Sequence, residues 1–448
     1  MKKLISVALI FSLVLVSGSL FAGGKQDTSG GTSGGGEVAI DMNEDGTINN
    51  PEDVKTDPNK LVFWSLFSGG DGTYMDKIIA DYNKTSPVKQ IQSVMLVWGD
   101  YYTKLGTAVA ARRGPDLGVA HESRLPELVD QGLVIPIDKY VQKTGLNWNE
   151  YAQATQDSVT FNGQKYAVPL DTFTAVVFIN VDKLNAAGIP LTNNQLSVKS
   201  PEEFKAILDK IKSVIKPDES TIAFSQTGDD PWRYWWAVYH QMGGTPFIDA
   251  AGKQVTMDKA IAVKAAAYVR SFWTDGYVLP GIDDPYKFFQ AGSAAMLFGF
   301  SWNTGVMAST AGLKMGAQPF PILFNKEVYW GGSHNLAIPV KRNRSEADTQ
   351  AAVDFLVYAS TRGSSTWAES GQIPANQQTR TSPAFLNLPF RKDYAKAASA
   401  VAFLPKDRHS AYFDRTASSA LDLIWTGQVT PEQGIENLYT DISDLIRR

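Results

Sequence analysis

Short apolar runs alternate along the chain with segments whose apolar residues recur at helical spacing. Residues 61–67 are almost entirely apolar, a glycine-rich turn follows at 68–72, and residues 74–82 then carry an apolar stripe formed by Met75, Ile78, Ile79 and Tyr82. The same order of strand, turn and helix recurs at 91–111, 117–130 and 176–187. This alternation predicts an α/β fold in which helices cover parallel strands.

The length of the chain indicates more than one α/β core. Of its 448 residues, about 410 remain after an N-terminal leader and linker, which suits two lobes of about 200 residues each. Open α/β sheets bind ligands at the carboxyl ends of their strands. Two such lobes that face each other would form a ligand cleft.

The first 36 residues are expected to contain a secretion signal and a linker. Lys2 and Lys3 precede an apolar run at 4–16 and small residues up to Ala22, which is the pattern of a cleaved secretory signal over residues 1–22. Residues 23–36 are rich in glycine and serine and predict a flexible linker. We expect a secreted or periplasmic protein, and an uncleaved signal that tethers it to the membrane is the alternative.

An acidic segment within residues 37–60 resembles the calcium loop of EF-hands. Its candidate ligands fall at positions 1, 3, 5, 7 and 12 of a twelve-residue loop with Gly46 at position 6, and they are Asp41, Asn43, Asp45, Thr47 and Glu52. The segment before the loop is not a helix former, so the match is incomplete. A structural calcium is expected here, with an ion-free acidic turn as the alternative, and no cofactor is required elsewhere.

Composition excludes several classes of function. The chain has no cysteine, which rules out disulfides, thiolate catalysis and the lipid-modified cysteine of a lipoprotein. Its 42 Lys and Arg against 46 Asp and Glu give a net charge of −4, so bulk charge draws it neither to nucleic acid nor to anionic lipid. We expect a monomer that binds no nucleic acid.

Several of the 11 tryptophans stand where predicted strands end. Trp98 is followed closely by Asp100, Trp232 follows an acidic turn, and Trp302 ends an apolar run. A sugar packs its C–H face on an aromatic plane, whereas its hydroxyls need carboxylate, amide or imidazole partners. Rings beside acids at strand ends therefore predict a carbohydrate site, although a large core could also use these rings.

The order of several segments resembles that of the substrate-binding proteins of bacterial ABC sugar importers, the maltose-binding-protein-like group within family 1 of the solute-binding proteins. The resemblance runs from about Leu61 to the C-terminus, and its segments are LVFWSLFSGGDGTYMDKIIADYNKTSP, WGDYYTKL, YAVPLDT, FFQAGSAAMLFGFSW, GGSHNLAIP and GQIPAN. It implies a two-lobed periplasmic-binding-protein fold of type II, with a carbohydrate held between the lobes and delivered to a membrane permease.

The resemblance also implies boundaries and site residues. Lobe 1 would comprise 61–170 and about 325–375, and lobe 2 would comprise 171–324 and about 376–448. The chain would cross between them near 169–174, 319–328 and 374–379. Rings that stack on the sugar would be Trp98, Trp232 and Trp302, with Phe413, or its neighbour Tyr412, at a further subsite. Groups that bind its hydroxyls or lie in the loop returning to lobe 1 would be Asp71, Asp100, His121, Asp171, Gly332, Ser333 and His334.

Two other classes of function stay open at this point. A secreted polysaccharide-cleaving enzyme would also need rings and carboxylates, but we predict no catalytic residue and no enzyme, because no nucleophile, metal or nucleotide motif is present. A calcium-dependent, lectin-like surface protein would use the EF-hand-like loop.

Overall fold

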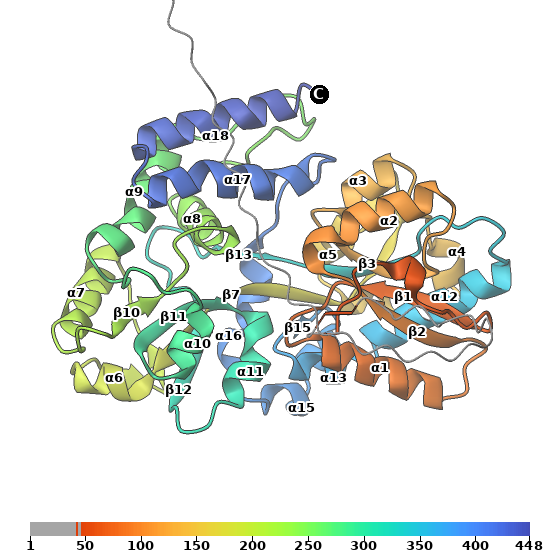
Figure 1. Ribbon diagram of the computed structural model, residues 1–448, viewed down its shortest axis with the longest axis horizontal. Coiled ribbons are helices and arrows are strands. Elements are labelled where there is room, and N and C mark those ends of the chain that lie inside the picture. The colour runs from red at the N-terminus through yellow and green to blue at the C-terminus, as the bar shows by residue number, and fades with distance from the viewer. Residues whose placement is uncertain (1–41, 44–45) are drawn as a thin grey trace, which may run out of the picture. The chain divides into compact units, whose positions relative to one another are not determined.

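The computed structural model describes residues 42–43 and 46–448, which belong to one compact unit, and the following concerns that unit alone. The predicted signal and linker, together with Asp41 and Asp45, lie outside the described residues. Two sheets, each with its own hydrophobic core, organise the unit into two lobes (Figure 1).

The first lobe is built on a five-stranded sheet of order β2-β1-β3-β14-β6. Its first three strands are parallel, and β14 runs antiparallel to both of its neighbours. The strands are β1 (Lys60–Ser65), β2 (Gln90–Met95), β3 (Leu117–His121), β6 (Ala167–Pro169) and β14 (His334–Ala337), and a separate hairpin joins β4 (Thr160–Phe161) to β5 (Gln164–Lys165).

Helices of the first lobe bury one face each against this sheet. The stripe expected at 74–82 is confirmed, because its four apolar residues are buried in α1. The helices are α1 (Gly72–Lys84), α2 (Tyr101–Ala110), α3 (Leu125–Asp130), α4 (Asp138–Val141), α5 (Gln153–Ser158), α12 (Glu346–Ser360) and α13 (Ser364–Glu369), with 3-10 helices η1 (Pro51–Asp53), η2 (Trp98–Asp100) and η3 (Trp148–Glu150).

The second lobe is organised around β7 (Asp171–Asn180), in which every residue is buried. Successive parts of this strand pair antiparallel with four other strands. The remaining strands are β8 (Leu191–Thr192), β9 (Gln195–Leu196), β10 (Ser220–Ala223), β11 (Ala294–Phe300), β12 (Met315–Pro319), β13 (Tyr329–Gly332), β15 (Ile373–Pro374) and β16 (Val401–Ala402).

Long helices of the second lobe enclose a core rich in aromatic rings. Trp235 and Trp236 of α8 are fully buried there. The helices are α6 (Val181–Ala186), α7 (Pro201–Lys212), α8 (Asp229–Gln241), α9 (Lys259–Thr274), α10 (Pro285–Gln290), α11 (Thr304–Ala308), α14 (Gln377–Arg380), α15 (Pro383–Leu386), α16 (Arg391–Tyr394), α17 (Ser410–Trp425) and α18 (Pro431–Leu445), with 3-10 helices η4 (Ser301–Asn303) and η5 (Ala395–Ala400).

The chain crosses between the two sheets at three places. It leaves the first sheet after β6 and enters the second in β7, and it returns between β13 and β14. It passes back a third time after α13, where Trp367 packs in the first core and Ile373 pairs with β7. The second crossing therefore lies at 332–334 instead of the expected 319–328, because Gly331 and Gly332 still pair with β7.

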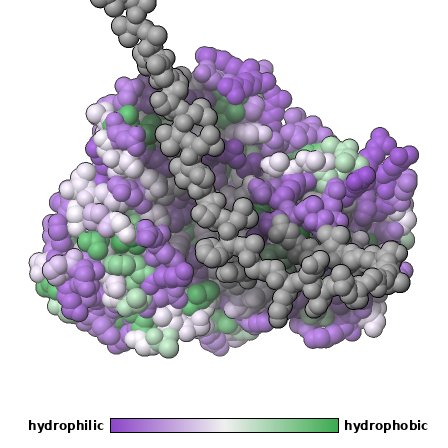
Figure 2. Space-filling model, viewed as in Figure 1, coloured by the Kyte–Doolittle hydropathy of each residue, from purple (hydrophilic) through white to green (hydrophobic). Residues whose placement is uncertain are grey.

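The surface is that of a water-exposed protein over most of the view in Figure 2, where hydrophilic residues dominate and apolar residues form small groups. Across residues 42–43 and 46–448, we find no helix with the length and apolar character needed to cross a membrane.

The third crossing depends on a glycine. Gly371 has φ of +116°, and a Cβ there would lie 2.1 Å from the carbonyl oxygen of Ser301. Gly312 also has a positive φ, +77°, but a Cβ there meets nothing within 4 Å. We expect Gly312→Ala to cost about 1 kcal/mol for its backbone conformation, and Gly371→Ala to cost about 2–3 kcal/mol because the backbone must also shift. Thermal unfolding of both variants checks this, and equal losses would contradict it.

Candidate functional site

A cavity of about 310 Å³ lies between the two lobes. From the first lobe it is lined by the segments that follow β1, β2 and β3, which are parallel strands whose carboxyl ends meet at one edge of the sheet. From the second lobe it is lined by the start of α8, by η4, by β13 and by α17. The alternation of strands and helices thus places loop side chains from both lobes around one space.

Aromatic rings form much of the wall on the side of the second lobe. Trp302 stacks on Phe300 with ring centroids 4.4 Å apart and planes within 4° of parallel. Trp330 stands nearly perpendicular to Trp302 at 6.2 Å. On the side of the first lobe, Trp98 lines the cavity with 42% of its surface exposed. The rings therefore offer flat apolar faces from both lobes.

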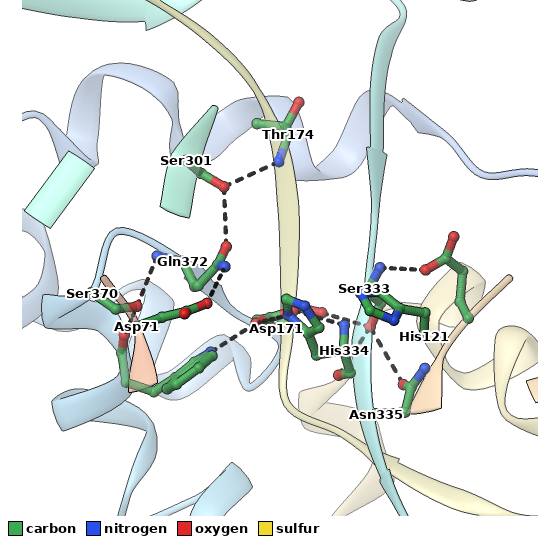
Figure 3. Close-up of polar contacts among 12 residues, drawn as sticks. Asp71, His121, Asp171, Thr174, Ser301, Ser333, His334, Asn335, Ser370 and Gln372 are labelled. Carbon is green, nitrogen blue, oxygen red and sulfur yellow. Dashed lines mark hydrogen bonds and ion pairs between the residues drawn. The ribbon is translucent and has the colours of Figure 1, made fainter. Parts of the chain in front are cut away.

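A buried carboxylate joins the crossings behind the cavity. Asp171, at 0% exposure, accepts hydrogen bonds from His334 N (2.9 Å), His334 Nδ1 (2.8 Å) and Trp367 Nε1 (2.7 Å). Figure 3 shows Asp171 beside His334 where the strands of the two lobes meet. Burial lowers the pKa of His334, but the charge and hydrogen bond of Asp171 outweigh that effect and raise it overall. His334 is thus fixed with its ring against the cavity.

A second set of hydrogen bonds links the turn between β1 and α1 to the second lobe. Gln372 Nε2 donates to Asp71 Oδ2 at 3.4 Å, and Ser301 Oγ donates to Gln372 Oε1 at 3.1 Å (Figure 3). The amide of Thr174 in β7 donates to Ser301 Oγ at 3.2 Å. Burial raises the pKa of Asp71. Asp71 therefore faces the cavity as a buried carboxyl group with a single long hydrogen bond from the opposite lobe.

His121 is held by a tyrosine of the next helix. Its Nδ1 lies 2.6 Å from Tyr102 Oη, and its backbone N–H donates to the same oxygen at 2.8 Å. Burial, followed by the nearby charge of His334, lowers the pKa of His121 well below its ordinary value. In the neutral tautomer in which the tyrosine hydroxyl donates to Nδ1, Nε2 carries the proton and is a hydrogen-bond donor.

Arg233 of α8 packs against the aromatic wall. Its guanidinium lies 4.7 Å from the ring centroid of Trp330 and 5.7 Å from that of Trp302, at distances typical of cation–π contacts. It forms ion pairs with Asp229 (3.2 Å) and Asp230 (3.3 Å), one turn before it on the same helix. These contacts fix the guanidinium beside the two rings at the wall of the cavity.

Two further carboxylates line the cavity from opposite lobes. Glu122 follows β3, and its Oε2 accepts the backbone N–H of Ser333 at 2.7 Å. Burial raises the pKa of Glu122 to about 7, and the charge of Asp414 contributes in the same direction. Asp414 belongs to α17, and burial raises its pKa to about 6.

The cavity brings together six of the eleven residues predicted for the sugar site. They are Asp71, Trp98, His121, Trp232, Trp302 and His334. Trp232 belongs to the wall although its side chain is fully buried. Each of these residues lies at the end of a strand or at the start of a helix, which is where the sequence argument placed them.

Five predicted residues do not line the cavity. Asp100 points away and pairs with Lys104 one helical turn later, at 2.9 Å. Phe413 is fully buried against Phe247 in the second core, so the stacking subsite assigned to it is wrong. Asp171, Gly332 and Ser333 are buried behind the cavity, where they hold the crossings in place instead of facing a ligand.

Other lining residues were missed. Trp330 belongs to β13, one residue after that strand begins, and its ring lines the cavity. Asp229 and Arg233 stand beside Trp232 in an acidic helix start, which was a usable signal. Nothing in the sequence singled out the remaining lining residues, among them Tyr102, Glu122, Arg124, Phe173, Gln372 and Asp414.

The EF-hand-like segment is only partly described. Asn43 Nδ2 donates to Thr47 Oγ1 (2.8 Å) and to Asn49 Oδ1 (3.1 Å), and Glu52 lies 3.8 Å from Arg113. Ile48 bridges to Leu96, which holds the segment against the edge of the first sheet. Among the residues whose placement is described, no group of three acidic, histidine or cysteine side chains could hold a metal ion. Because Asp41 and Asp45 are outside that set, calcium binding stays a prediction.

Comparisons with known proteins agree on the architecture. Residues 68–364 match the family described as bacterial extracellular solute-binding protein. The chain is 19% identical over 362 residues to the maltotriose-binding protein of Pyrococcus abyssi, covering 79% of this chain and 75% of that protein.

Solved structures show the same fold. The GacH receptor of Streptomyces glaucescens, solved unliganded and in complex with acarbose, has a TM-score of 0.75 at 17% identity and covers 87% of this chain and 98% of its own. UgpB from Mycobacterium tuberculosis, in complex with glycerophosphocholine, has a TM-score of 0.74 at 18% identity, over 88% and 99% of the two chains. The expected two-lobed α/β fold of type II is confirmed.

The raised pKa of Glu122 predicts a pH-dependent stability. A carboxyl group whose pKa rises from 4.5 to about 7 on folding destabilises the folded state as pH increases between those values. Glu122→Gln, which cannot ionise, should leave stability unchanged near pH 4.5 and raise it by up to about 3 kcal/mol at pH 8. Calorimetry of the ligand-free protein at both pH values measures this.

Asp441→Asn provides the control, because Asp441 is exposed on α18. It should show no comparable gain at pH 8. A difference between Glu122→Gln and the unsubstituted protein that stays constant from pH 4.5 to pH 8 would contradict the assignment.

Proposed function

Because the chain belongs to the family of bacterial extracellular solute-binding proteins, we propose that it binds a carbohydrate outside the cytoplasmic membrane and delivers it to the permease of an ABC importer. The proposal includes no bond cleavage. It is carried by one observation, a cavity between two lobes where flat aromatic faces stand beside buried carboxyl and imidazole groups. This combination suits a ligand with apolar faces and a rim of hydroxyls.

The names of related proteins support a saccharide as the ligand of this chain. One relative is named for maltotriose, and one similar structure was solved with acarbose. The glycerophosphocholine complex of UgpB shows that the same fold also carries other solutes. The aromatic wall of this chain and the hydrogen-bonding groups around it favour the saccharide.

The cavity continues outward, which supports an oligosaccharide. A neighbouring cavity of about 380 Å³ shares several lining residues with the first, including Trp98, Arg124 and Asp414. It extends between α2 and α3 of the first lobe and α17 of the second. Trp98 lies at the junction, where it could stack on a second sugar unit.

A substitution at that junction tests the site. Trp98→Ala should weaken binding of a saccharide about tenfold, because a stacking face is lost while the exposed position keeps the fold intact. A thermal-shift screen of neutral mono- and oligosaccharides supplies the ligand, and titration calorimetry measures its affinity. Trp148→Ala, a partly buried tryptophan outside the cavity, should leave affinity unchanged. Equal affinities for the two variants would contradict the assignment of Trp98 to the saccharide site.

A measurement of lobe closure provides a second test of the proposed function. Three contacts bridge the lobes beside the cavity: Tyr412 Oη donates to Glu127 at 2.9 Å, Lys406 Nζ donates to the carbonyl of Asp157 at 2.7 Å, and Arg408 pairs with Asp130 at 3.7 Å. Because these contacts are already present in the structure, we expect a bound ligand to stabilise this closed arrangement, so the radius of gyration in small-angle scattering should fall at saturating saccharide. An unchanged radius with a bound saccharide would favour an open, lectin-like surface.

A further inference from the structure

The basic groups of the cavity already have acidic partners. Arg233 pairs with Asp229 and Asp230, and Arg124 lies 3.8 Å from Glu127 and stacks over the ring of Tyr102. The imidazole of His334 is bound to Asp171. Each positive charge facing the inner cavity is therefore balanced from within the wall, and Arg415 lines only the outer cavity.

Three carboxyl groups of the inner cavity have no direct ion-pair partner, although the charges of Arg233 and Arg124 act on Asp414 and that of His334 acts on Asp71 and Glu122. Asp71 receives the long hydrogen bond from Gln372, and Glu122 receives the backbone N–H of Ser333. Asp414 Oδ1 is buried and has no hydrogen-bond partner among the described residues. None of the three forms an ion pair within that part of the chain. The lining of the inner cavity thus holds more acidic side chains than arginines, and Asp71, Glu122 and Asp414 have no ion pair of their own when ionised.

The three groups come from both lobes. Asp71 and Glu122 follow strands of the first lobe, whereas Asp414 lies on α17 of the second, and all three line one cavity. Like charges that approach each other when the lobes come together disfavour closure. A positive group held between Glu122 and Asp414 would reverse this effect and attract both lobes to the ligand.

We propose that the saccharide bound in the inner cavity carries a protonated amine, so that the ligand is an amino sugar. This inference rests on the proposed function. An ammonium group supplies a positive charge and three N–H donors, which matches carboxyl groups on opposite walls. The rings of Trp98 and Phe173 line the same space and add faces that attract a cation.

The same charge pattern selects against other sugars. A uronate or a phosphorylated sugar would add negative charge beside three carboxyl groups, and both arginines that could receive it are already paired. An N-acetylated sugar keeps the bulk of the amine substituent but loses its charge. The charge of the nitrogen, more than its size, is therefore expected to set affinity.

A matched set of sugars tests the inference. Titration calorimetry at pH 7 would compare glucosamine and its β-1,4 dimer to tetramer with the corresponding glucose and N-acetylglucosamine series and with glucuronate. We expect the amine series to bind about tenfold or more tightly than either neutral series, and glucuronate not to bind. Asp414→Asn should reduce this preference several-fold, whereas Asp441→Asn, at an exposed position on α18, should leave it unchanged.

Each outcome separates the two proposals. Neutral sugars that bind as tightly as their amine counterparts, or a preference that survives in both Asp414→Asn and Glu122→Gln, would overturn the amine inference and leave carbohydrate binding standing. If the neutral-saccharide screen yields a ligand but no amine sugar binds, the amine inference is also overturned and carbohydrate binding still stands. If neither the saccharide screen nor the amine, neutral and acidic sugars of the calorimetric series bind, the proposed function itself is overturned.

Discussion

The buried carboxylate of Asp171 is the interaction on which the arrangement of the two lobes depends. It stands at the first crossing, and its side chain binds the backbone and ring of His334 at the second crossing and the indole of Trp367 at the third. Its backbone carbonyl accepts the hydroxyl of Ser333 as well. A carboxylate with no exposure to water is tolerated only because these donors surround it. The three crossings are therefore held at one point.

This junction sets the geometry of the cavity in front of it. His334 and Phe173 leave the junction on strands of different sheets and meet with ring centroids 4.8 Å apart. The aromatic wall is continuous with them, because Phe173 also contacts Trp302 and Trp330. Rings that would be a loose cluster in separate loops are instead packed on a central, fully buried strand. The ligand faces are thus rigid on the side of the second lobe, and Trp98 supplies an exposed face on the other.

Charge is distributed around this framework in two different ways. Arg233 and its two aspartates form a compact group within one helix turn, in which the guanidinium has ion-pair partners. Asp71, Glu122 and Asp414 instead come from three distant segments and form no ion pair among the described residues. A buried charge without a partner is costly in a folded protein. Its presence at a cavity between two lobes is more readily explained by a ligand than by stability.

Strand ends could be located from the sequence, and this accounts for the place of Asp71, Trp98, His121 and Trp302 at the cavity. The direction of a side chain within a helix could not be predicted from the sequence. Asp100 and Phe413 lie close to the cavity in sequence terms, but Asp100 turns to Lys104 and Phe413 turns into the core, while its neighbours Tyr412 and Asp414 face the cleft. Successive helical residues point about 100° apart, so a shift of one position decides whether a residue binds ligand or packs.

The sequence by itself determined the α/β alternation, the two cores, the absence of cysteine chemistry and the edge of each sheet where a ligand would bind. These depend on local periodicity and composition, which are properties of neighbouring residues. Only the tertiary structure decided which carboxylates have partners. Asp171 is fully buried and Asp414 is partly buried, yet one is surrounded by donors from two other crossings, and the other has a buried oxygen with none among the described residues. That difference arises from contacts between residues far apart in the chain, which no local pattern records.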